Sequence, residues 1–345
     1  MEKIVTIEDI AKAAGVGKGT VDRVLHNRGR VSEETRDRVL QCIKELNYKP
    51  NKAARMLAKK RNYRIAVTFQ NEEKEFWDQI QNGVDKAAEE YKPLGVTIDY
   101  YILPQIDVEK QLEVILHVIG HHYDGLAIVP YDSPQIAEAL NRAIDQGIEV
   151  ITFNNKDRKI HCSYIGSHGL QSGRTAGRML AMIAGANSRY AVISAHNKRM
   201  AQIDERSEGL QEILRETRKD MVLTEVFTFS EDHKKVYRKV KEIFQTRYKE
   251  IDAIYVTTAI AGTVAKAIED SGIQKKIIFI GHDLTDTIIS YMKKGIIDIS
   301  IGQEPERQGY LAVSKICEKL LSDEKIDKDE YTRISVVVKE NIDYI

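Results

Sequence analysis

The stretch Thr6–Asn27 constrains the fold of this 345-residue chain most, because it has the pattern of two short helices joined by a glycine-containing turn. Thr6 followed by Asp9 predicts a helix start, since the threonine oxygen can accept a hydrogen bond from a free N–H of the first turn. Gly15-Val16-Gly17 interrupts that helix, and a second helix is predicted from about Lys18. Two such helices form a helix-turn-helix, whose second helix is suited to enter the major groove of DNA.

A third helix and a basic segment complete this region. Ser32 is a good N-cap for the third helix, and that helix closes a small apolar core with Val39, Ile43 and Leu46. The following segment, 51–58, is too short to hold a helix alone in water, although two copies could stabilise each other side by side. It leads into the basic run Lys59–Arg61.

The order of these segments resembles the lactose-repressor (LacI/GalR) family of bacterial transcription regulators. Four runs carry the resemblance: T-I-E-D-I-A-K-A-A-G-V at 6–16, T-V-D-R-V-L at 20–25, V-S-E-E-T-R-D-R-V at 31–39 and L-N-Y-K-P-N-K-A-A-R-M-L at 46–57. It implies a DNA reader in which paired hinge helices enter the minor groove and Leu57 wedges into a central base step. A small helical bundle without a DNA role is the alternative.

The resemblance also implies which residues contact DNA. Lys18 and Gly19 open the second helix, and because glycine offers no side-chain donor, we expect Lys18 and Arg23 to dominate direct readout and to favour guanines. Asp22 is tolerable there only if it accepts from a cytosine amino group or pairs with Arg23. The full expected set is Thr6, Ile7, Gly17, Lys18, Gly19, Thr20, Asp22, Arg23, His26, Arg30, Ser32, Thr35, Tyr48, Asn51, Ala54 and Leu57.

The distribution of charge agrees with a DNA-binding head. Residues 1–64 hold 16 of the 52 Lys and Arg residues and 8 of the 52 Asp and Glu residues, a net charge of +8. The whole chain has a net charge of +0, so the remaining residues carry −8. A basic head supplies the salt-dependent attraction to phosphate that a DNA reader needs.

The sequence predicts no catalytic site, cofactor or metal. The run Gly15–Thr20 ends like a phosphate-binding loop, but a helix precedes it and the glycine spacing differs from that motif. Motifs of serine hydrolases, zinc proteases and dinucleotide-binding enzymes are missing. The three cysteines are far apart and odd in number, which favours reduced thiols in a cytosolic protein: Cys42, Cys162 and Cys317. Neither a signal peptide nor a membrane-spanning run is found, so we expect a cytoplasmic protein.

From Arg64 onward, strands and helices alternate. Strands are predicted at 65–69, 96–102, 125–129, 150–153, 190–194, 222–227, 253–257 and 277–281, and helices at 76–91, 107–119, 134–146, 205–216, 232–247 and 261–271. Alternating units of this kind form doubly wound parallel sheets with helices on both faces. This many strands over about 280 residues suit two sheets better than one. The break at Asn154–Gly169 marks the first crossover between them.

This body resembles the type I periplasmic sugar-binding fold, so the predicted fold class is a multidomain chain with an all-α helix-turn-helix head and an α/β body of two doubly wound lobes. The boundaries we expect are a head at 1–49, a hinge helix and linker at 50–62 and a ligand-binding domain at 63–345. Within that domain, lobe 1 is expected at about 63–165 and 286–322, and lobe 2 at about 166–285 and 323–345.

Ligands of open α/β sheets bind beyond the carboxyl ends of the strands, here in the cleft between the lobes. The resemblance suggests a stacking aromatic pair, an arginine fork, a carboxylate for paired hydroxyls and several neutral partners. The candidates are Phe76, Trp77, Asp132, Asn154, Asn155, Arg206, Thr258, Asp283 and Gln303. Asn154-Asn155 and Thr258 depart from the residues usual in sugar binders, and each candidate could instead be a core or interlobe contact.

The function we expect is a ligand-responsive transcription regulator, in the manner of a repressor, that senses a small sugar or polyol. Its partners would be pseudo-palindromic operator DNA, a sugar-like effector and a second copy of the chain, with no membrane. A carbohydrate-binding protein without a DNA role is the alternative. An enzyme on a doubly wound fold, such as a sugar kinase or dehydrogenase, would need phosphate- or dinucleotide-binding glycines that the sequence lacks.

Overall fold

The chain divides into two compact units, residues 1–60 and 61–345. The computed structural model describes residues 5–25, 29, 31–46, 61–195, 200–229, 232–273, 275–322 and 329–345. Most of the predicted hinge, 50–62, lies outside the described residues, so the hinge helix stays a prediction.

The first unit contains three helices, α1 (Ile7–Ala14), α2 (Lys18–Leu25) and α3 (Glu33–Glu45). Thr6 and Asp9 form a capping box at the start of α1, and Gly15 ends that helix in a left-handed conformation with φ 64°. Ser32 caps α3 through a bond from the Thr35 N–H. The helices enclose a small core of Ile10, Ala11, Ala14, Val21, Val24 and Val39. The predicted three-helix head is therefore confirmed.

Leu46 does not belong to that core. It is the C-cap of α3 and remains 36% exposed, whereas the sequence placed it inside with Val39 and Ile43. Ile43 packs against the core but is only partly buried. The helix ends before Leu46 can turn inward, so the core is smaller than expected.

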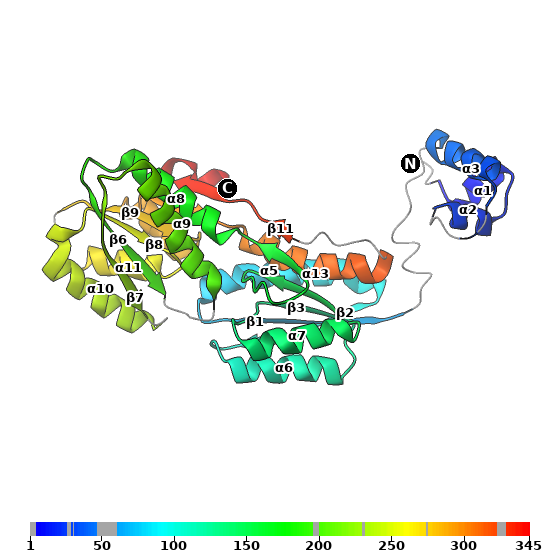
Figure 1. Ribbon diagram of the computed structural model, residues 1–345, viewed down its shortest axis with the longest axis horizontal. Helices are drawn as coiled ribbons and strands as arrows, with labels where there is room; N and C mark the ends of the chain where they lie inside the picture. Colours follow the sequence, from blue (N-terminus) through cyan, green and yellow to red (C-terminus); the bar gives the residue numbers. More distant parts are fainter. Residues whose placement is uncertain are drawn as a thin grey trace. The chain divides into compact units, whose positions relative to one another are not determined.

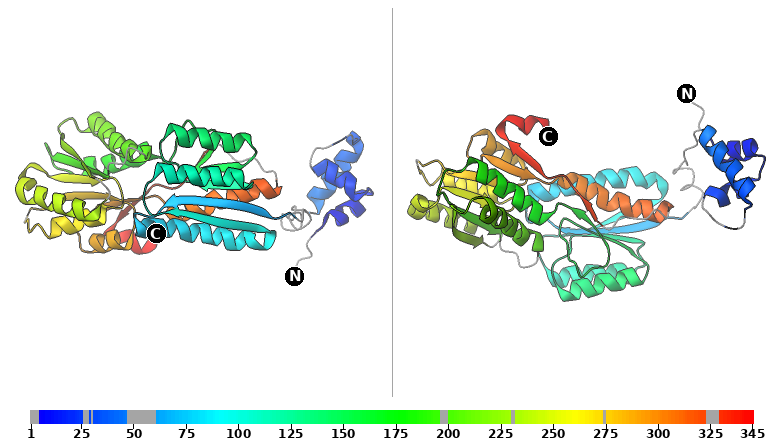
Figure 2. Two further views of the ribbon diagram at one scale, coloured as in Figure 1. Left: turned by 90° about the horizontal axis from the view of Figure 1, so that it is seen from below. Right: turned by 45° about the horizontal axis from the view of Figure 1, so that its top comes forward.

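The body consists of two lobes, each a sheet between two layers of helices (Figure 1). The first sheet is parallel, in the order β11 (Asp329–Tyr331), β5 (Ser163–Gly166), β4 (Glu149–Phe153), β3 (Gly125–Ile128), β1 (Tyr63–Gln70), β2 (Val96–Leu103). Helices α5 (Lys74–Tyr91) and α13 (Pro305–Ser322) lie side by side on one face, and α6 (Val108–Gly120) and α7 (Pro134–Asp145) cover the other (Figures 1 and 2).

The second sheet has the order β12 (Ser335–Val338), β10 (Ile299–Gly302), β9 (Ile278–His282), β8 (Ala253–Val256), β6 (Arg189–Ala195), β7 (Val222–Phe229). Only β12 among these runs antiparallel to its neighbour. Helices α8 (Gly169–Ile183) and α9 (Ala201–Thr217) pack on one face, and α10 (His233–Arg247), α11 (Ala261–Glu269) and α12 (Asp286–Lys293) on the other. Short 3₁₀ turns occupy Lys92–Leu94, Tyr248–Glu250 and Lys339–Tyr344.

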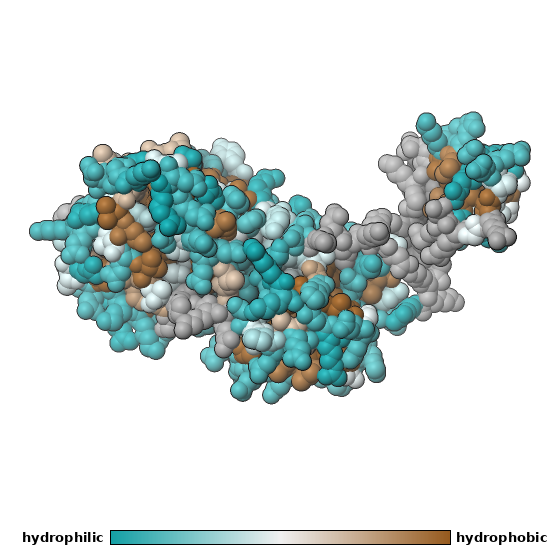
Figure 3. Space-filling view, in the orientation of Figure 1, coloured by the Kyte–Doolittle hydropathy of each residue, from teal (hydrophilic) through white to brown (hydrophobic). Residues whose placement is uncertain are grey.

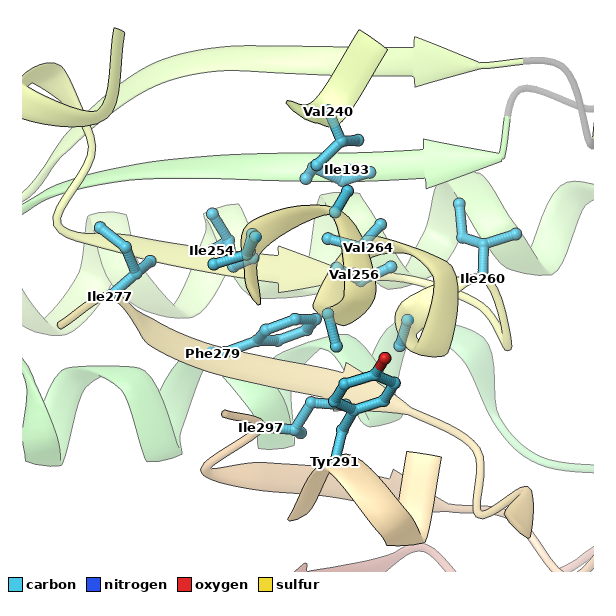
Figure 4. Packing of buried hydrophobic residues seen from close by; sticks show 14 of the residues in the cluster. Ile193, Val240, Ile254, Val256, Ile260, Val264, Ile277, Phe279, Tyr291 and Ile297 are labelled. Carbon is cyan, nitrogen blue, oxygen red and sulfur yellow. The ribbon is translucent and has the colours of Figure 1, made fainter. Parts of the chain in front are cut away.

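The central strands of both sheets are buried on both faces. All four residues of β3 and of β8 are buried, as expected for parallel strands between helix layers. Figure 4 shows one such layer in the second lobe, where side chains of β8, β9, α10 and α11 meet. In the face of the molecule drawn in Figure 3, hydrophobic residues show as separate groups among hydrophilic ones. The predicted two-lobed α/β body is confirmed.

A pair of helices in each lobe approaches unusually closely at glycines. In the first lobe, a Cβ atom on Gly83 of α5 would collide with the Glu306 carbonyl, and one on Gly309 of α13 with the Ile80 carbonyl. In the second lobe, Gly173 of α8 lies against the Arg206 backbone of α9. Since any side chain would separate the helices, Gly83 and Gly309 hold α5 against α13, and Gly173 fixes the position of the helix that carries Arg206.

The predicted lobe boundaries are wrong in two places. Residues 286–302, assigned to lobe 1, form α12 and β10 of the second lobe, because β10 pairs with β9. Strand β11, assigned to lobe 2, joins the first sheet beside β5. The chain therefore crosses between lobes after β5, after β10 and after β11. The sequence also predicted three crossings, but only the first was placed correctly; the second was expected at about 285 and the third at about 322.

Candidate functional site

A cavity that is partly open to solvent lies between the lobes at the carboxyl ends of the parallel strands. This is the position at which open α/β sheets bind ligands. Its lining combines aromatic, aliphatic and amide side chains with three ionisable ones: Gln70, Glu73, Phe76, Trp77, Asn154, Met200, Gln202, Ile203, Arg206, Thr258, Ala259, Asp283 and Gln303. An apolar pocket with a few convergent polar groups is the usual architecture of a small-molecule site.

Arg206 is the cation at the centre of the cavity. It projects from α9 and is only 4% exposed. Its Nη1 atom donates to the Thr257 carbonyl at 2.8 Å, and Nη2 donates to the Gln303 amide oxygen at 3.1 Å. Its Nε atom and the Thr258 hydroxyl are buried and have no hydrogen-bond partner among the described residues. Burying these two atoms without a hydrogen-bond partner costs free energy, so the cavity favours a polar ligand that can bond to them.

Asp283 follows β9 and faces the same cavity. Gln303 donates to its carboxylate at 2.6 Å, and Ser300 donates to its backbone carbonyl at 2.6 Å. Burial raises the pKa of the Asp283 carboxyl to about 6, although the Arg206 charge and the Gln303 bond act in the opposite direction. Asp283 and Asn154 both have a positive φ, 73° and 59°, a conformation that costs energy in non-glycine residues and clusters at functional sites.

The remaining side chains around Arg206 and Asp283 form one hydrogen-bonded network that reaches both lobes. Ser167 donates to Gln303 at 2.9 Å, and Gln303 accepts at its backbone carbonyl from Gln308 of α13 at 2.8 Å. Asn154 of the first lobe donates to the Gln308 amide oxygen at 3.1 Å. The network therefore ties the cavity to the crossover that leads into α13.

The aromatic wall of the cavity belongs to α5. Trp77 stacks on Phe69 with ring centroids 5.6 Å apart, and Phe76 meets Trp77 edge to face at 5.1 Å. Trp77 is only 2% exposed. The pair therefore packs as core and lines the cavity at the same time, so a flat apolar ligand face would meet rings that are already held in place.

The structure brings most of the predicted ligand residues together. Phe76, Trp77, Asn154, Arg206, Thr258, Asp283 and Gln303 line the one cavity. Asn155 and Asp132 do not line it: Asn155 is buried and donates to the Pro130 carbonyl at 2.7 Å, while Asp132 lies 3.6 Å from Lys159. Both turn back to the first lobe after strand ends, so proximity to a strand end was not a sufficient criterion.

Sequence reasoning missed six lining residues, Gln70, Glu73, Met200, Gln202, Ile203 and Ala259. Gln202 precedes Arg206 by one helical turn, so it shares the same face of α9 and could have been found from that spacing. Gln70 ends β1 and Glu73 is the N-cap of α5, so both lie at the same strand end that suggested Phe76. Met200 and Ala259 carry no sequence signal of this kind.

In the first unit, α2 exposes the residues expected to read bases. Lys18, Gly19, Asp22 and Arg23 are exposed, whereas Val21 and Val24 face the core. The Lys18 ammonium lies 3.0 Å from the Glu8 carboxylate of α1, and this contact lowers the pKa of Glu8. The other expected contact residues that the structure describes lie along the same helices or at their starts: Thr6, Ile7, Gly17, Thr20, Ser32 and Thr35. His26, Arg30, Tyr48, Asn51, Ala54 and Leu57 lie outside the described residues.

In the ranges that the structure describes, His, Cys, Asp and Glu form no group of three or more suited to a metal ion. No helix among those residues is long and apolar enough to cross a membrane. Burial raises the pKa of both the Cys162 and the Cys317 thiol, consistent with unreactive structural cysteines.

Comparison with known proteins gives both units a family. Residues 65–324 match the periplasmic binding protein domain, and residues 6–51 match the bacterial regulatory proteins of the lacI family. Catabolite control protein A of Staphylococcus aureus is 27% identical over 212 residues, which are 61% of this chain and 61% of that protein. The protein of the same name from Staphylococcus xylosus is 31% identical over 157 residues, 45% of this chain and 46% of that one. The match thus spans less than two thirds of these relatives.

Solved structures show the same fold for the body. GanP, a glucose-galactose binding protein from Geobacillus stearothermophilus, superimposes with a TM-score of 0.72 at 22% identity, covering 82% of this chain and 99% of that one. A solute binding protein of an ABC transporter from Burkholderia graminis, in complex with D-arabinose, gives a TM-score of 0.75 at 22% identity, with 83% and 98% covered. At these identities the similarity establishes the fold.

Proposed function

The chain belongs to the lacI family of bacterial regulatory proteins and carries a periplasmic-binding-protein domain, and from that premise we propose that it is a sequence-specific DNA-binding transcription regulator controlled by a small sugar or polyol. The observation that carries the proposal is the coexistence, in one chain, of an exposed basic recognition helix and an interlobe cavity with a buried arginine and aspartate.

The head supports the DNA-binding part of the proposal. The α2 helix has only eight residues, so a single copy reaches few base edges, and a homodimer on a pseudo-palindromic operator would double the contact. Such a protein acts in the cytoplasm, where its operator is. Leu57 of each hinge would wedge into the minor groove, as the family resemblance implies.

The chemistry of the cavity supports a polyhydroxylated effector. Arg206 offers a planar fork, Asp283 accepts bonds, and the amides of Gln202, Gln303 and Asn154 both donate and accept. The Phe76–Trp77 wall suits the apolar face of a sugar ring. Two proteins of the same fold are named as binding glucose and galactose or D-arabinose, which agrees with this class.

The switch would follow from the two lobes. A ligand that bridges Arg206 and Asp283 of one lobe and Asn154 of the other favours the closed body, and it changes DNA affinity only if it binds the two states unequally. Linkage then requires operator DNA to change ligand affinity by the same factor by which the ligand changes operator affinity. Equal ligand affinity with and without operator would leave the protein a DNA binder with an uncoupled cavity.

The experiment has two steps on the full chain. Thermal shift against D-glucose, D-galactose, D-arabinose, D-allose and ribitol identifies the effector, because a bound ligand raises stability by mass action. Titration of bulk duplex DNA at two salt concentrations then tests the head, for which we expect affinity to fall steeply with salt. Sugar binding without salt-sensitive DNA binding would favour the alternative, a carbohydrate-binding protein without a DNA role.

A further inference from the structure

A set of contacts joins the two lobes along one edge of the cavity, outside the polar network of Arg206. Gln79 of α5 donates to the Leu284 carbonyl at 3.1 Å. The Thr287 N–H and hydroxyl donate to the Glu75 carboxylate at 3.1 and 2.6 Å. His233 Nε2 lies 3.0 Å from Glu73 Oε1. We call this set the interlobe latch: Glu73, Glu75, Gln79, His233, Leu284 and Thr287.

In the interlobe latch, the Glu75 carboxylate of the first lobe meets the N-terminus of α12 in the second lobe. Thr287 is the second residue of α12, so its N–H has no partner inside its own helix. Glu75 supplies that partner from the other lobe and places a negative charge at the positive end of the helix dipole. Burial acts to raise the pKa of Glu75, but the bonds from Thr287 outweigh it and hold the pKa below its usual value. The Glu75 carboxylate and the N-terminus of α12 are therefore complementary in charge.

A second contact of the interlobe latch joins His233 of the second lobe to Glu73 of the first. The Thr263 hydroxyl of α11 lies 2.5 Å from His233 Nδ1, and His233 Nε2 approaches Glu73 Oε1 to 3.0 Å without hydrogen-bond geometry. Glu73 also lines the effector cavity, and the next turn of α5 carries Phe76 and Trp77. One segment of α5 thus presents its aromatic side to the cavity and its carboxylates to the opposite lobe.

We propose that Glu75 and Thr287 are positioning residues that hold the lobes closed over the effector cavity without touching the effector. Neither residue lines the cavity. The consequence for regulation rests on the proposed function: a latch that stabilises the closed body lowers the share of effector binding energy needed for closure, and so raises effector affinity.

Trp77 provides a test that needs neither effector nor DNA. It is the only tryptophan of the chain, it lines the cavity, and it is almost fully buried when the lobes are closed. Opening the lobes exposes its indole, so acrylamide quenching of the ligand-free full chain reports the open fraction. Loss of charged but partly exposed hydrogen bonds in Glu75→Ala is expected to shift the closed-to-open ratio about three- to tenfold and to raise quenching accordingly.

A matched control lies on the same helix. Asp78 is a carboxylate of α5 that lies 2.6 Å from Lys74, one turn away in the same lobe. Asp78→Asn removes the same charge from α5 as Glu75→Gln, and we expect it to leave Trp77 quenching unchanged. Glu75→Gln keeps an acceptor oxygen for Thr287 and should fall between the wild type and Glu75→Ala. A merely structural role of Glu75 would not give this order.

Thr287→Val tests the pair from the second lobe. It removes the hydroxyl that lies 2.6 Å from Glu75 and should raise quenching less than Glu75→Ala does. The double variant should quench no more than Glu75→Ala alone, because both changes remove one interaction. Additive effects, or wild-type quenching in Glu75→Ala with unchanged circular dichroism, would overturn the latch. Since no sugar is used, failure of the latch and failure of the proposed function are distinguished.

Discussion

The recognition helix of the head and the cavity of the body hold their functional side chains in opposite ways. The side chain of Lys18 in the head is 64% exposed, and it pairs with the exposed carboxylate of Glu8. Arg206 of the body is 4% exposed and bonds to a carbonyl and two amides. Exposed residues can change with little effect on the fold, whereas each cavity residue also helps to position its neighbours. Substitutions that change DNA specificity should therefore destabilise the fold less than substitutions that change effector specificity.

Two glycine substitutions, one in the body and one in the head, should show the largest difference in stability between the two regions. Gly173→Val places a side chain against the Arg206 backbone, so we expect a loss of about 3 kcal/mol in the free energy of unfolding of the body and loss of sugar binding. Gly19→Ala meets nothing within 4 Å in the head, and should change stability by less than about 0.5 kcal/mol. Urea unfolding of both variants checks this. Equal stability of the two would mean that α8 moves away from α9 without cost.

Arg206→Lys sharpens the comparison at the cavity itself. Lysine keeps the charge but loses the planar fork that bonds Thr257 and Gln303. We expect sugar affinity to fall about 10- to 100-fold, because a charged hydrogen bond contributes about 1.5–3 kcal/mol. Calorimetric titration measures the change, and operator binding without sugar should stay near the wild-type value. An unchanged affinity would show that the fork does not contact the sugar.

Lys18→Ala is the corresponding change in the head. If Lys18 reads a guanine, the variant should lose about 1–3 kcal/mol of discrimination at one operator position and keep its stability. Binding to a set of single-base operator variants gives the measurement. A uniform loss across all sequences would instead assign Lys18 to a phosphate.

The head and the body also differ in how well their structure could be predicted from the sequence. The head was predicted almost completely, because its capping box, left-handed glycine and helix periodicity are local signals. In the body, local patterns predicted the alternation of strands and helices, and the resemblance to sugar-binding proteins suggested Arg206, Asp283 and Gln303, which line one cavity. They did not predict that β11 returns to the first sheet or that Glu75 meets Thr287, since such pairings depend on contacts between distant segments.

The affinity of the cavity for sugar should also depend on pH. The Asp283 pKa of about 6 is raised by burial above its usual value, so the contribution of Asp283 to stability is fully present below pH 3.8 and is lost as pH rises toward 6. Sugar hydroxyls that donate to the ionised carboxylate have the opposite preference. We therefore expect sugar affinity to rise up to about tenfold between pH 5 and pH 7. In Asp283→Asn this rise should disappear; its persistence would point to another group.

The smallest expected effect concerns Glu8, the partner of Lys18. Glu8→Gln removes an exposed ion pair, so the stability of the head should change little. In free protein Lys18 is then released from a competing carboxylate, and a negative charge is removed from the side of the head that carries Lys18. Affinity for bulk DNA should rise a few-fold at low salt and converge with the wild type at high salt, because the gain is electrostatic and screened. A gain that persists at high salt would mean that Glu8 restrains Lys18 sterically. The exposed Lys18 side chain would then depend on its neighbour for its position, as the buried Arg206 side chain of the cavity does.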